Sequence, residues 1–246
     1  MDSPAIPAAT LILVRDRPGQ APELLMVERA RGMAFAAGAM VFPGGRIDDH
    51  DRTLADSIGT SAEAVAAVRE TLEETAIPAG LDPIPNVMTA RDLQRNLLAE
   101  KPFGELLEVA GLRIDHAALV PFARWVPKFH AVRRFDTLFF VAREPAGEWH
   151  PEVVVGECAG ASWISAGEVL RRDAVGEASL IFPTRRTLER LALHRDFDAI
   201  AADARDHPIA PITPWVEERD GERFITISAG LGFPVTQEKL DGLWRG

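Results

Sequence analysis

Residues 68–77 have the sequence VRETLEETAI, and they follow a second short stretch, FPGG, at residues 42–45. If residues 68–77 form an α-helix, Glu70, Glu73 and Glu74 stand at positions i, i+3 and i+4, so their carboxylates emerge on one face within about one turn. The aliphatic residues of the opposite face are expected to pack against the core, and they are Val68, Leu72 and Ile77. The pattern therefore predicts an amphipathic helix with an acidic face, preceded by a buried strand that ends in a glycine turn.

Three like charges on one helical turn repel one another, and each neighbouring pair costs about 0.2–0.5 kcal/mol. A divalent cation removes this conflict, because magnesium takes one or two carboxylates together with waters and phosphate oxygens. The alternative is an acidic helix face exposed to solvent. The upstream turn and the adjacent Arg69 favour the metal site, since Gly44 and Gly45 let the backbone turn sharply and approach a ligand.

These stretches resemble the signature of the Nudix hydrolase family, G-x5-E-x7-R-E-U-x-E-E-x-G-U, in which U is aliphatic. Gly45 matches the first glycine, and the matches in the second half are Arg69, Glu70, Glu73, Glu74 and Ile77. Arg69 follows Gly45 by 24 positions, ten more than in the signature. Thr71 occupies an aliphatic position of the signature, and Ala76 occupies that of the late glycine.

The inserted residues leave the early glutamate of the signature unassigned. Counting back from Arg69 leads to Ser61, with Glu63 close by, whereas Asp51 lies on the other side of the insertion. Asp51 ends a polar run, DDHD at residues 48–51. We expect this run to be a solvent-exposed insertion loop rather than a second metal site.

The resemblance implies an α/β Nudix fold, an α/β/α sandwich with a mixed sheet, and a metal-dependent enzyme. It implies that Mg²⁺ or Mn²⁺ binds Glu70 and Glu74, with Glu73 as a further ligand or as a partner of Arg69. Arg69 would then clamp the acidic cluster instead of contacting substrate. The general base is left open between Glu70 and Glu157, with an ordinary surface role as the alternative for Glu157.

Within the family, the chain is most similar to the acyl-CoA diphosphatase branch. That branch also lengthens the signature, which is called the Nudix box, before its RExxEE helix. The resemblance is carried by the interrupted box and by residues 38–45, 134–142 and 182–184. It implies hydrolysis of coenzyme A or acyl-CoA to 3′,5′-ADP and (acyl-)phosphopantetheine. Two alternatives stay open: a Nudix pyrophosphatase acting on ADP-ribose, NADH or a related nucleotide, and a non-catalytic nucleotide sensor.

Substrate-binding candidates come from three places in the sequence. Gly44 and Gly45 form the turn, and Arg29 belongs to a stretch, LMVERA, that keeps the arginine but lacks the threonine of a related coenzyme A hydrolase motif. Arg133 and Arg134 belong to a basic connector at residues 127–134. Arginine binds phosphate in a bidentate manner, so this connector is a candidate phosphate contact, and a solvent-facing loop is the alternative.

Composition restricts the classes of function. The net charge of −10 argues against nucleic acid as the main partner. A metal can still bring anionic small molecules to an acidic protein. The single cysteine, Cys158, excludes an intramolecular disulfide and is expected to be a buried core thiol. No signal peptide or membrane span is apparent, so we expect a cytoplasmic protein with a small-molecule diphosphate substrate, no membrane partner and a homodimer as one option.

We expect one Nudix domain over residues 1–246, with a helical insertion at about 78–118 and a C-terminal extension of helix and hairpin from about 183. Strands are predicted at 10–14, 23–29, 39–42, 119–126, 137–142, 153–155 and 161–164. The acidic helix should begin near Ser61 and end near Thr75, because Pro78 follows. Asp220-Gly221 predicts the turn of a β-hairpin over residues 215–227.

Overall fold

The computed structural model describes residues 4–30, 32, 38–126, 134–153 and 158–240. Within them, a mixed sheet has the strand order β10-β7-β8-β1-β2-β3, with β4 paired to β1 and β9 paired to β2. The strands of this sheet are β1 (Ile6–Arg15), β2 (Glu23–Arg29), β3 (Met40–Val41), β4 (Gly44–Arg46), β7 (Val120–Trp125), β8 (Phe135–Arg143), β9 (Cys158–Ser165) and β10 (Pro211–Ile212). The long central strand β1 runs parallel to β8 and antiparallel to β2.

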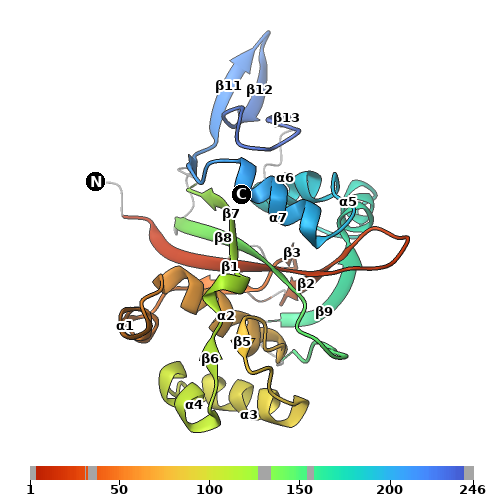
Figure 1. The fold of residues 1–246 in the computed structure, drawn as a ribbon. Helices are drawn as coiled ribbons and strands as arrows, with labels where there is room; N and C mark the ends of the chain where they lie inside the picture. Colours follow the sequence, from red (N-terminus) through yellow and green to blue (C-terminus); the bar gives the residue numbers. More distant parts are fainter. Residues whose placement is uncertain (1–3, 31, 33–37, 127–133, 154–157, 241–246) are drawn as a thin grey trace.

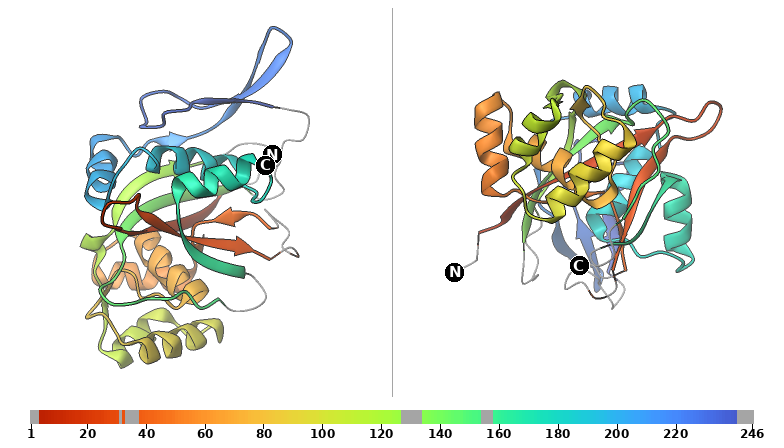
Figure 2. Two further views of the ribbon diagram at one scale, coloured as in Figure 1. Left: turned by 90° about the vertical axis from the view of Figure 1, so that its right-hand side faces the viewer. Right: turned by 90° about the horizontal axis from the view of Figure 1, so that it is seen from below.

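Helices cover both faces of this sheet (Figure 1). On one face lie α1 (Asp49–Ile58) and α2 (Ala62–Thr75), and α3 (Val87–Leu98) and α4 (Phe103–Ala110) pack against these two helices on the side away from the sheet. The helices on the other face are α5 (Ala166–Ala174), α6 (Phe182–Leu191) and α7 (Phe197–Asp206), and the left view of Figure 2 shows the sheet between the two groups of helices from the side. Alternate residues of β1 enter the two cores: Leu11 and Leu13 pack with the α2 layer, and Ile12 and Val14 pack with the α6 layer. This arrangement confirms the predicted α/β/α sandwich.

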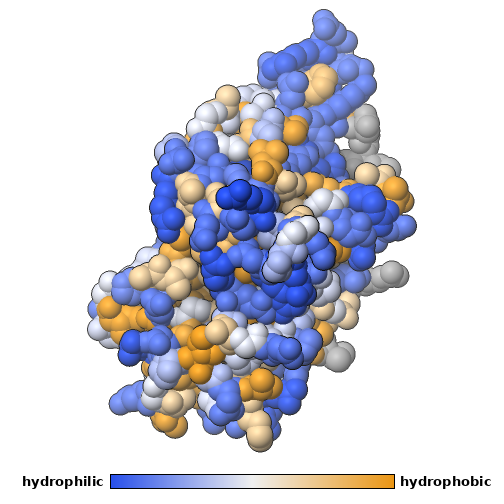
Figure 3. Space-filling view, turned by 45° about the vertical axis from the view of Figure 1, so that its right-hand side comes forward, coloured by the Kyte–Doolittle hydropathy of each residue, from blue (hydrophilic) through white to orange (hydrophobic). Residues whose placement is uncertain are grey.

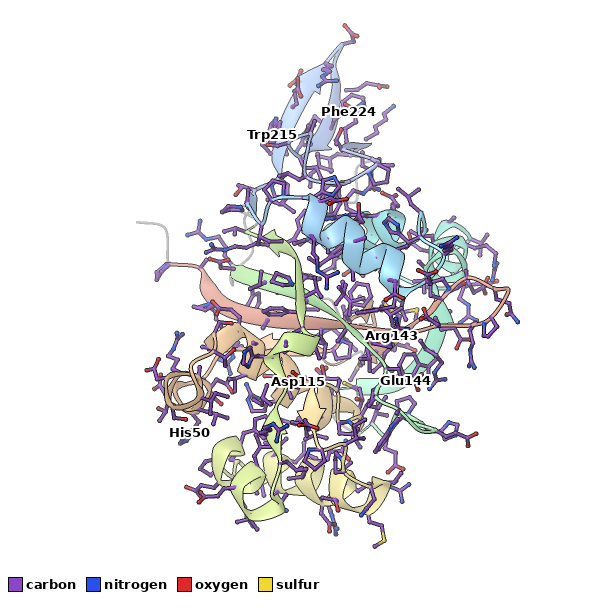
Figure 4. All side chains as sticks on the ribbon, viewed as in Figure 1. His50, Asp115, Arg143, Glu144, Trp215 and Phe224 are labelled. Atoms are coloured by element: carbon purple, nitrogen blue, oxygen red, sulfur yellow. The ribbon has the colours of Figure 1, made fainter. Side chains whose placement is uncertain are left out.

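Three further strands, β11 (Trp215–Arg219), β12 (Glu222–Thr226) and β13 (Gln237–Lys239), form a small antiparallel sheet that projects from the α6 layer (Figure 1). Asp220 and Gly221 both have positive φ values, 53° and 77°, as a tight hairpin turn between twisted strands requires. The predicted hairpin is therefore confirmed. Its outer end is mostly hydrophilic in Figure 3, and Trp215 and Phe224 mark its position in Figure 4.

Most of the predicted elements are confirmed within one to four residues of their predicted ends. Helix α2 begins after Ser61, whose side chain accepts a hydrogen bond from the Ala64 N–H, and it ends at Thr75. Residues 78–118, predicted as a helical insertion, contain the helices α3 and α4. The short strand β5 (Leu81–Asp82) precedes these helices and pairs antiparallel with β6 (Arg113–Ile114), which follows them and leads to a 3-10 turn, η1 (His116–Ala118). Cys158 is buried, as expected. Among the described residues, no helix is long and apolar enough to cross a bilayer.

The prediction of a solvent-exposed loop after the glycine turn is wrong. Residues 49–58 form helix α1, because Asp48 and Asp51 cap its first turn reciprocally, each side chain accepting from the other's backbone N–H. His50 is exposed on the outer side of this helix (Figure 4), but Asp51 is 1% exposed. Helix α7 was not predicted, and Val153 lies outside any strand; residues 154 and 155 of that predicted strand lie outside the described residues.

Ala76 ends α2 in the left-handed region, with φ 57°, at the position where the family signature has glycine. A residue with a Cβ atom costs about 1–2 kcal/mol in this region, and glycine avoids that cost. Glycine also gives the unfolded chain more conformational entropy, which cancels part of the gain in stability. We therefore expect Ala76→Gly to raise the free energy of unfolding by about 0.5–1 kcal/mol, measured by urea denaturation. Ala66→Gly, inside the same helix, should lower it by about 1 kcal/mol. A destabilised Ala76→Gly variant would contradict this account of the helix end.

Candidate active site

Arg69, on α2, connects the acidic helix to the segment that precedes it. Its Nε and Nη2 atoms donate to the two carboxylate oxygens of Asp51, each at 2.8 Å, and Nη2 also donates to the Arg46 carbonyl at 3.0 Å. Its Nη1 atom lies 3.1 Å from Glu70 Oε1 and 3.3 Å from Glu73 Oε2. Burial alone would lower the pKa of Arg69, but Asp51 and Glu70 outweigh burial and raise it, so the guanidinium stays charged.

Asp51 is the residue that sequence reasoning left unassigned. It is the sixth residue after Gly45, so it stands where the signature places its early glutamate when that position is counted forward from the glycine. The inserted residues lie after Asp51, and the chain returns through the rest of α1 to bring Asp51 against Arg69. Ser61 instead caps α2, and Glu63 belongs to the first turn of α2. Counting from both ends of the box is the signal that finds Asp51.

The predicted glycine turn at residues 42–45 is a bend at Pro43 that leads into β4, so Gly44 and Gly45 themselves are in a strand; this glycine turn lies directly against the glutamates. The Gly44 N–H donates to Glu74 Oε2 at 3.1 Å. A Cβ atom added to Gly45 would stand 2.3 Å from Glu70 Oε1, closer than any real Cβ contact, so only glycine fits here without moving the Glu70 carboxylate. The two features that carry the sequence prediction, the FPGG turn and the ExxEE helix face, therefore meet in one place.

Glu70 is more buried than Glu73, with side-chain exposures of 16% and 26%. Its burial raises its pKa to about 7, with Glu73 adding to the rise and the neighbouring Arg69 opposing it. The cause is desolvation, which penalises the charged form of a carboxylate. A cation placed beside this group would favour the charged form again.

The donor set fits a magnesium or manganese ion. Glu70, Glu73 and Glu74 come from one helix face, and the glycine turn leaves their carboxylates uncovered by any side chain of its own. In the described part of the chain, no group of three His, Cys, Asp or Glu side chains is arranged to hold a metal ion by itself. Magnesium does not need three protein side chains, because it takes one or two carboxylates with waters and substrate phosphate oxygens.

Two of the other candidate residues, Arg29 and Arg134, are placed by backbone hydrogen bonds. Arg29 ends β2, where its N–H donates to the Ala39 carbonyl and its carbonyl accepts from the Gly38 N–H. Arg134 precedes β8, and its carbonyl accepts from the Ile6 N–H. Arg133 and Glu157, like the rest of the basic connector from 127 to 133, lie outside the described residues. The structure therefore brings together the glycine turn and the glutamates, with Arg69 and Asp51 behind them.

A cavity of about 560 Å³ lies away from the glutamates, between α1, α4 and the paired strands β5 and β6. Its lining includes Leu54, Leu107, Leu112 and His116 and none of the three glutamates. The geometry of the acidic cluster, rather than this cavity, therefore defines the candidate site.

Comparison with known proteins agrees with this geometry. The NUDIX domain model matches residues 5–96, a range that contains the glycine turn, α1 and α2. Residues 5–96 thus match a NUDIX domain, and the chain is similar to Nudix hydrolases over most of its length. A solved Nudix hydrolase from Alicyclobacillus acidocaldarius has a TM-score of 0.72 at 28% identity, covering 81% of this chain and 96% of that one.

Two curated Nudix relatives match in sequence. The nudix hydrolase 7 of Caenorhabditis elegans is 27% identical over 209 residues, 82% of this chain and 66% of that protein. The Nudix hydrolase NudL of Cronobacter sakazakii is 42% identical over 71 residues, 29% of this chain and 31% of that protein. The chain thus spans two thirds or less of the length of these Nudix relatives.

The Asp51–Arg69 pair predicts a large and specific stability effect. Asp51→Asn keeps the shape of the side chain but removes the buried, bidentate carboxylate partner of Arg69, so we expect a loss of about 3 kcal/mol in the free energy of unfolding. Asp49 lies two residues earlier in the same turn of α1, and its side chain is fully exposed. Asp49→Asn should therefore cost less than about 1 kcal/mol of the free energy of unfolding. Urea unfolding of both variants measures the difference, and equal losses would show that the pair does not hold the site.

Proposed function

We propose that this chain is a divalent-metal-dependent hydrolase that cleaves the diphosphate of a nucleoside diphosphate linked to a second group. The observation that carries the proposal is the cluster of Glu70, Glu73 and Glu74. It lies against the glycine turn, and the two glycines have no side chains that would cover the carboxylates. A bound magnesium or manganese ion would neutralise the phosphate oxygens and make a bound water more acidic. The protein's part is to hold the carboxylates: Arg69 fixes Glu70 and Glu73, and the Gly44 N–H fixes Glu74.

We infer further that coenzyme A or acyl-CoA is the substrate, with 3′,5′-ADP and (acyl-)phosphopantetheine as products. Water adds to one phosphorus atom, the bond from that phosphorus to the bridging oxygen breaks, and each product keeps one of the two phosphates of the diphosphate; 3′,5′-ADP also retains its 3′-phosphate. Support comes from the resemblance of the interrupted box to the acyl-CoA diphosphatase branch. The interruption is a defined structural element, the part of α1 that follows Asp51. ADP-ribose and NADH are the competing substrates, and a nucleotide sensor is the competing non-catalytic function.

The first test is product analysis with magnesium, offering acyl-CoA, ADP-ribose and NADH separately to the wild type and to Glu74→Gln. Removing one carboxylate should lower kcat/KM at least about 100-fold, because metal ions supply several kcal/mol of transition-state stabilisation. Glu63→Gln, an identical change in the first turn of the same helix, should leave kcat/KM within about twofold.

The outcomes separate the candidate functions. Release of 3′,5′-ADP and acyl-phosphopantetheine by the wild type would support both the chemistry and the coenzyme A assignment. Cleavage of ADP-ribose or NADH alone would keep the metal-dependent chemistry and remove coenzyme A. If no diphosphate is cleaved with magnesium or manganese, while nucleotide binding is retained, the sensor replaces the hydrolase.

A further inference from the structure

The C-terminal end of α2 is held by residues from outside the helix. The Ala76 N–H still donates to the Leu72 carbonyl at 2.8 Å, but the Ile77 N–H turns to the Thr75 hydroxyl at 3.3 Å. The Glu73 carbonyl therefore does not receive the bond that a continuing helix would give it from residue 77. A buried carbonyl without a donor is strongly disfavoured, so another group must supply one.

Gln94, on α3, supplies it. Its side chain is 5% exposed, and its Nε2 atom donates to the Glu73 carbonyl at 3.0 Å and to the Glu152 carbonyl at 2.8 Å. Both partners are backbone carbonyls, which accept only, so the amide nitrogen must face them. The Glu152 N–H in turn donates to the Thr75 carbonyl at 2.8 Å. One amide group thus joins α3, the last turn of α2 and the backbone at Glu152.

The last turn of α2 is also the turn that carries Glu73 and Glu74. Their side chains reach the other way, to Arg69 Nη1 and to the Gly44 N–H. The backbone of this turn is thus held on one side by Gln94 and Glu152, and its carboxylates are held on the other by Arg69 and the glycine turn. A shift of the backbone on the first side moves the carboxylates on the second.

We propose that Gln94 is a positioning residue for the reaction, one that orients the Glu73 and Glu74 carboxylates toward the metal by fixing the end of α2. This proposal rests on the proposed function. Two donor hydrogens on one nitrogen are required, so the isosteric carboxylate of glutamate, which accepts only when ionised, cannot replace the amide. Methionine fills the same space with no donor.

The test compares Gln94→Met and Gln94→Glu with the wild type, and it uses Glu152→Gln as the matched control. Glu152→Gln changes the exposed side chain that pairs with Arg91 but leaves the Glu152 backbone in place. We expect both Gln94 variants to bind Mn²⁺ about tenfold more weakly and to lose about tenfold in kcat, with KM for the diphosphate within about twofold. The control should match the wild type in all three quantities.

Hydrogen exchange gives a readout that needs neither metal nor turnover. In the metal-free protein, the Glu152 amide should exchange at least about tenfold faster in Gln94→Met than in the wild type, because its acceptor on Thr75 is no longer held in place. If Gln94→Met does not fold, Gln94→Asn keeps both donors on a shorter side chain and should give intermediate values. Faster exchange with unchanged Mn²⁺ affinity and kcat would reduce Gln94 to a purely structural contact and overturn the proposal.

The outcomes also distinguish this proposal from the proposed function. A wild type that binds Mn²⁺ but cleaves no diphosphate would refute the hydrolase, while the Mn²⁺ affinities of the variants would still decide the role of Gln94. Equal Mn²⁺ affinity and equal rates of diphosphate cleavage in the wild type and in both Gln94 variants would refute only the positioning role. A wild type that binds no Mn²⁺ would overturn the role of Gln94 directly.

Discussion

The buried ion pair between Arg69 and Asp51 is the interaction on which the candidate site depends. A guanidinium at this depth is stable only when its donors are met, and here they are met by Asp51, the Arg46 carbonyl, Glu70 and Glu73. Arg69 thereby offsets the mutual repulsion of the glutamates before any cation arrives. It also ties α1, the strand after the glycine turn and α2 into one unit, which accounts for the short approach of Gly45 to Glu70.

This pair explains how the box can be lengthened without losing its geometry. What the site requires is that Asp51 reaches Arg69, and that condition concerns distance in space instead of spacing in sequence. The added residues complete α1 and the turn before α2, and α1 packs on α4, where Leu54 lies against Gly104. A longer connection costs little in loop entropy when it forms an element that buries its own apolar residues.

Sequence reasoning predicted the elements whose signals are local and strong. The spacing of apolar and acidic residues fixed α2, and the apolar runs fixed β1 and β2, because these patterns reflect which face is buried. It failed for α1, since four polar residues at its start carry no apolar period, and a buried aspartate looks the same in sequence as an exposed one. Only the distant Arg69 decides between the two. Gln94 was hidden for the same reason, because its partners are backbone carbonyls and leave no trace in the residue pattern.

The left-handed Ala76 shows why α1 and α3 act together. Ending α2 abruptly at this residue frees the Glu73 carbonyl, and α3 supplies the missing donor through Gln94. The α1 segment lies on the other side of α2, where Asp51 holds Arg69. The acidic turn is thus fixed at its backbone by α3 and behind its side chains by the α1 segment. A helix held from both sides can keep three carboxylates close together, whereas a free helix would relieve their repulsion by bending or fraying.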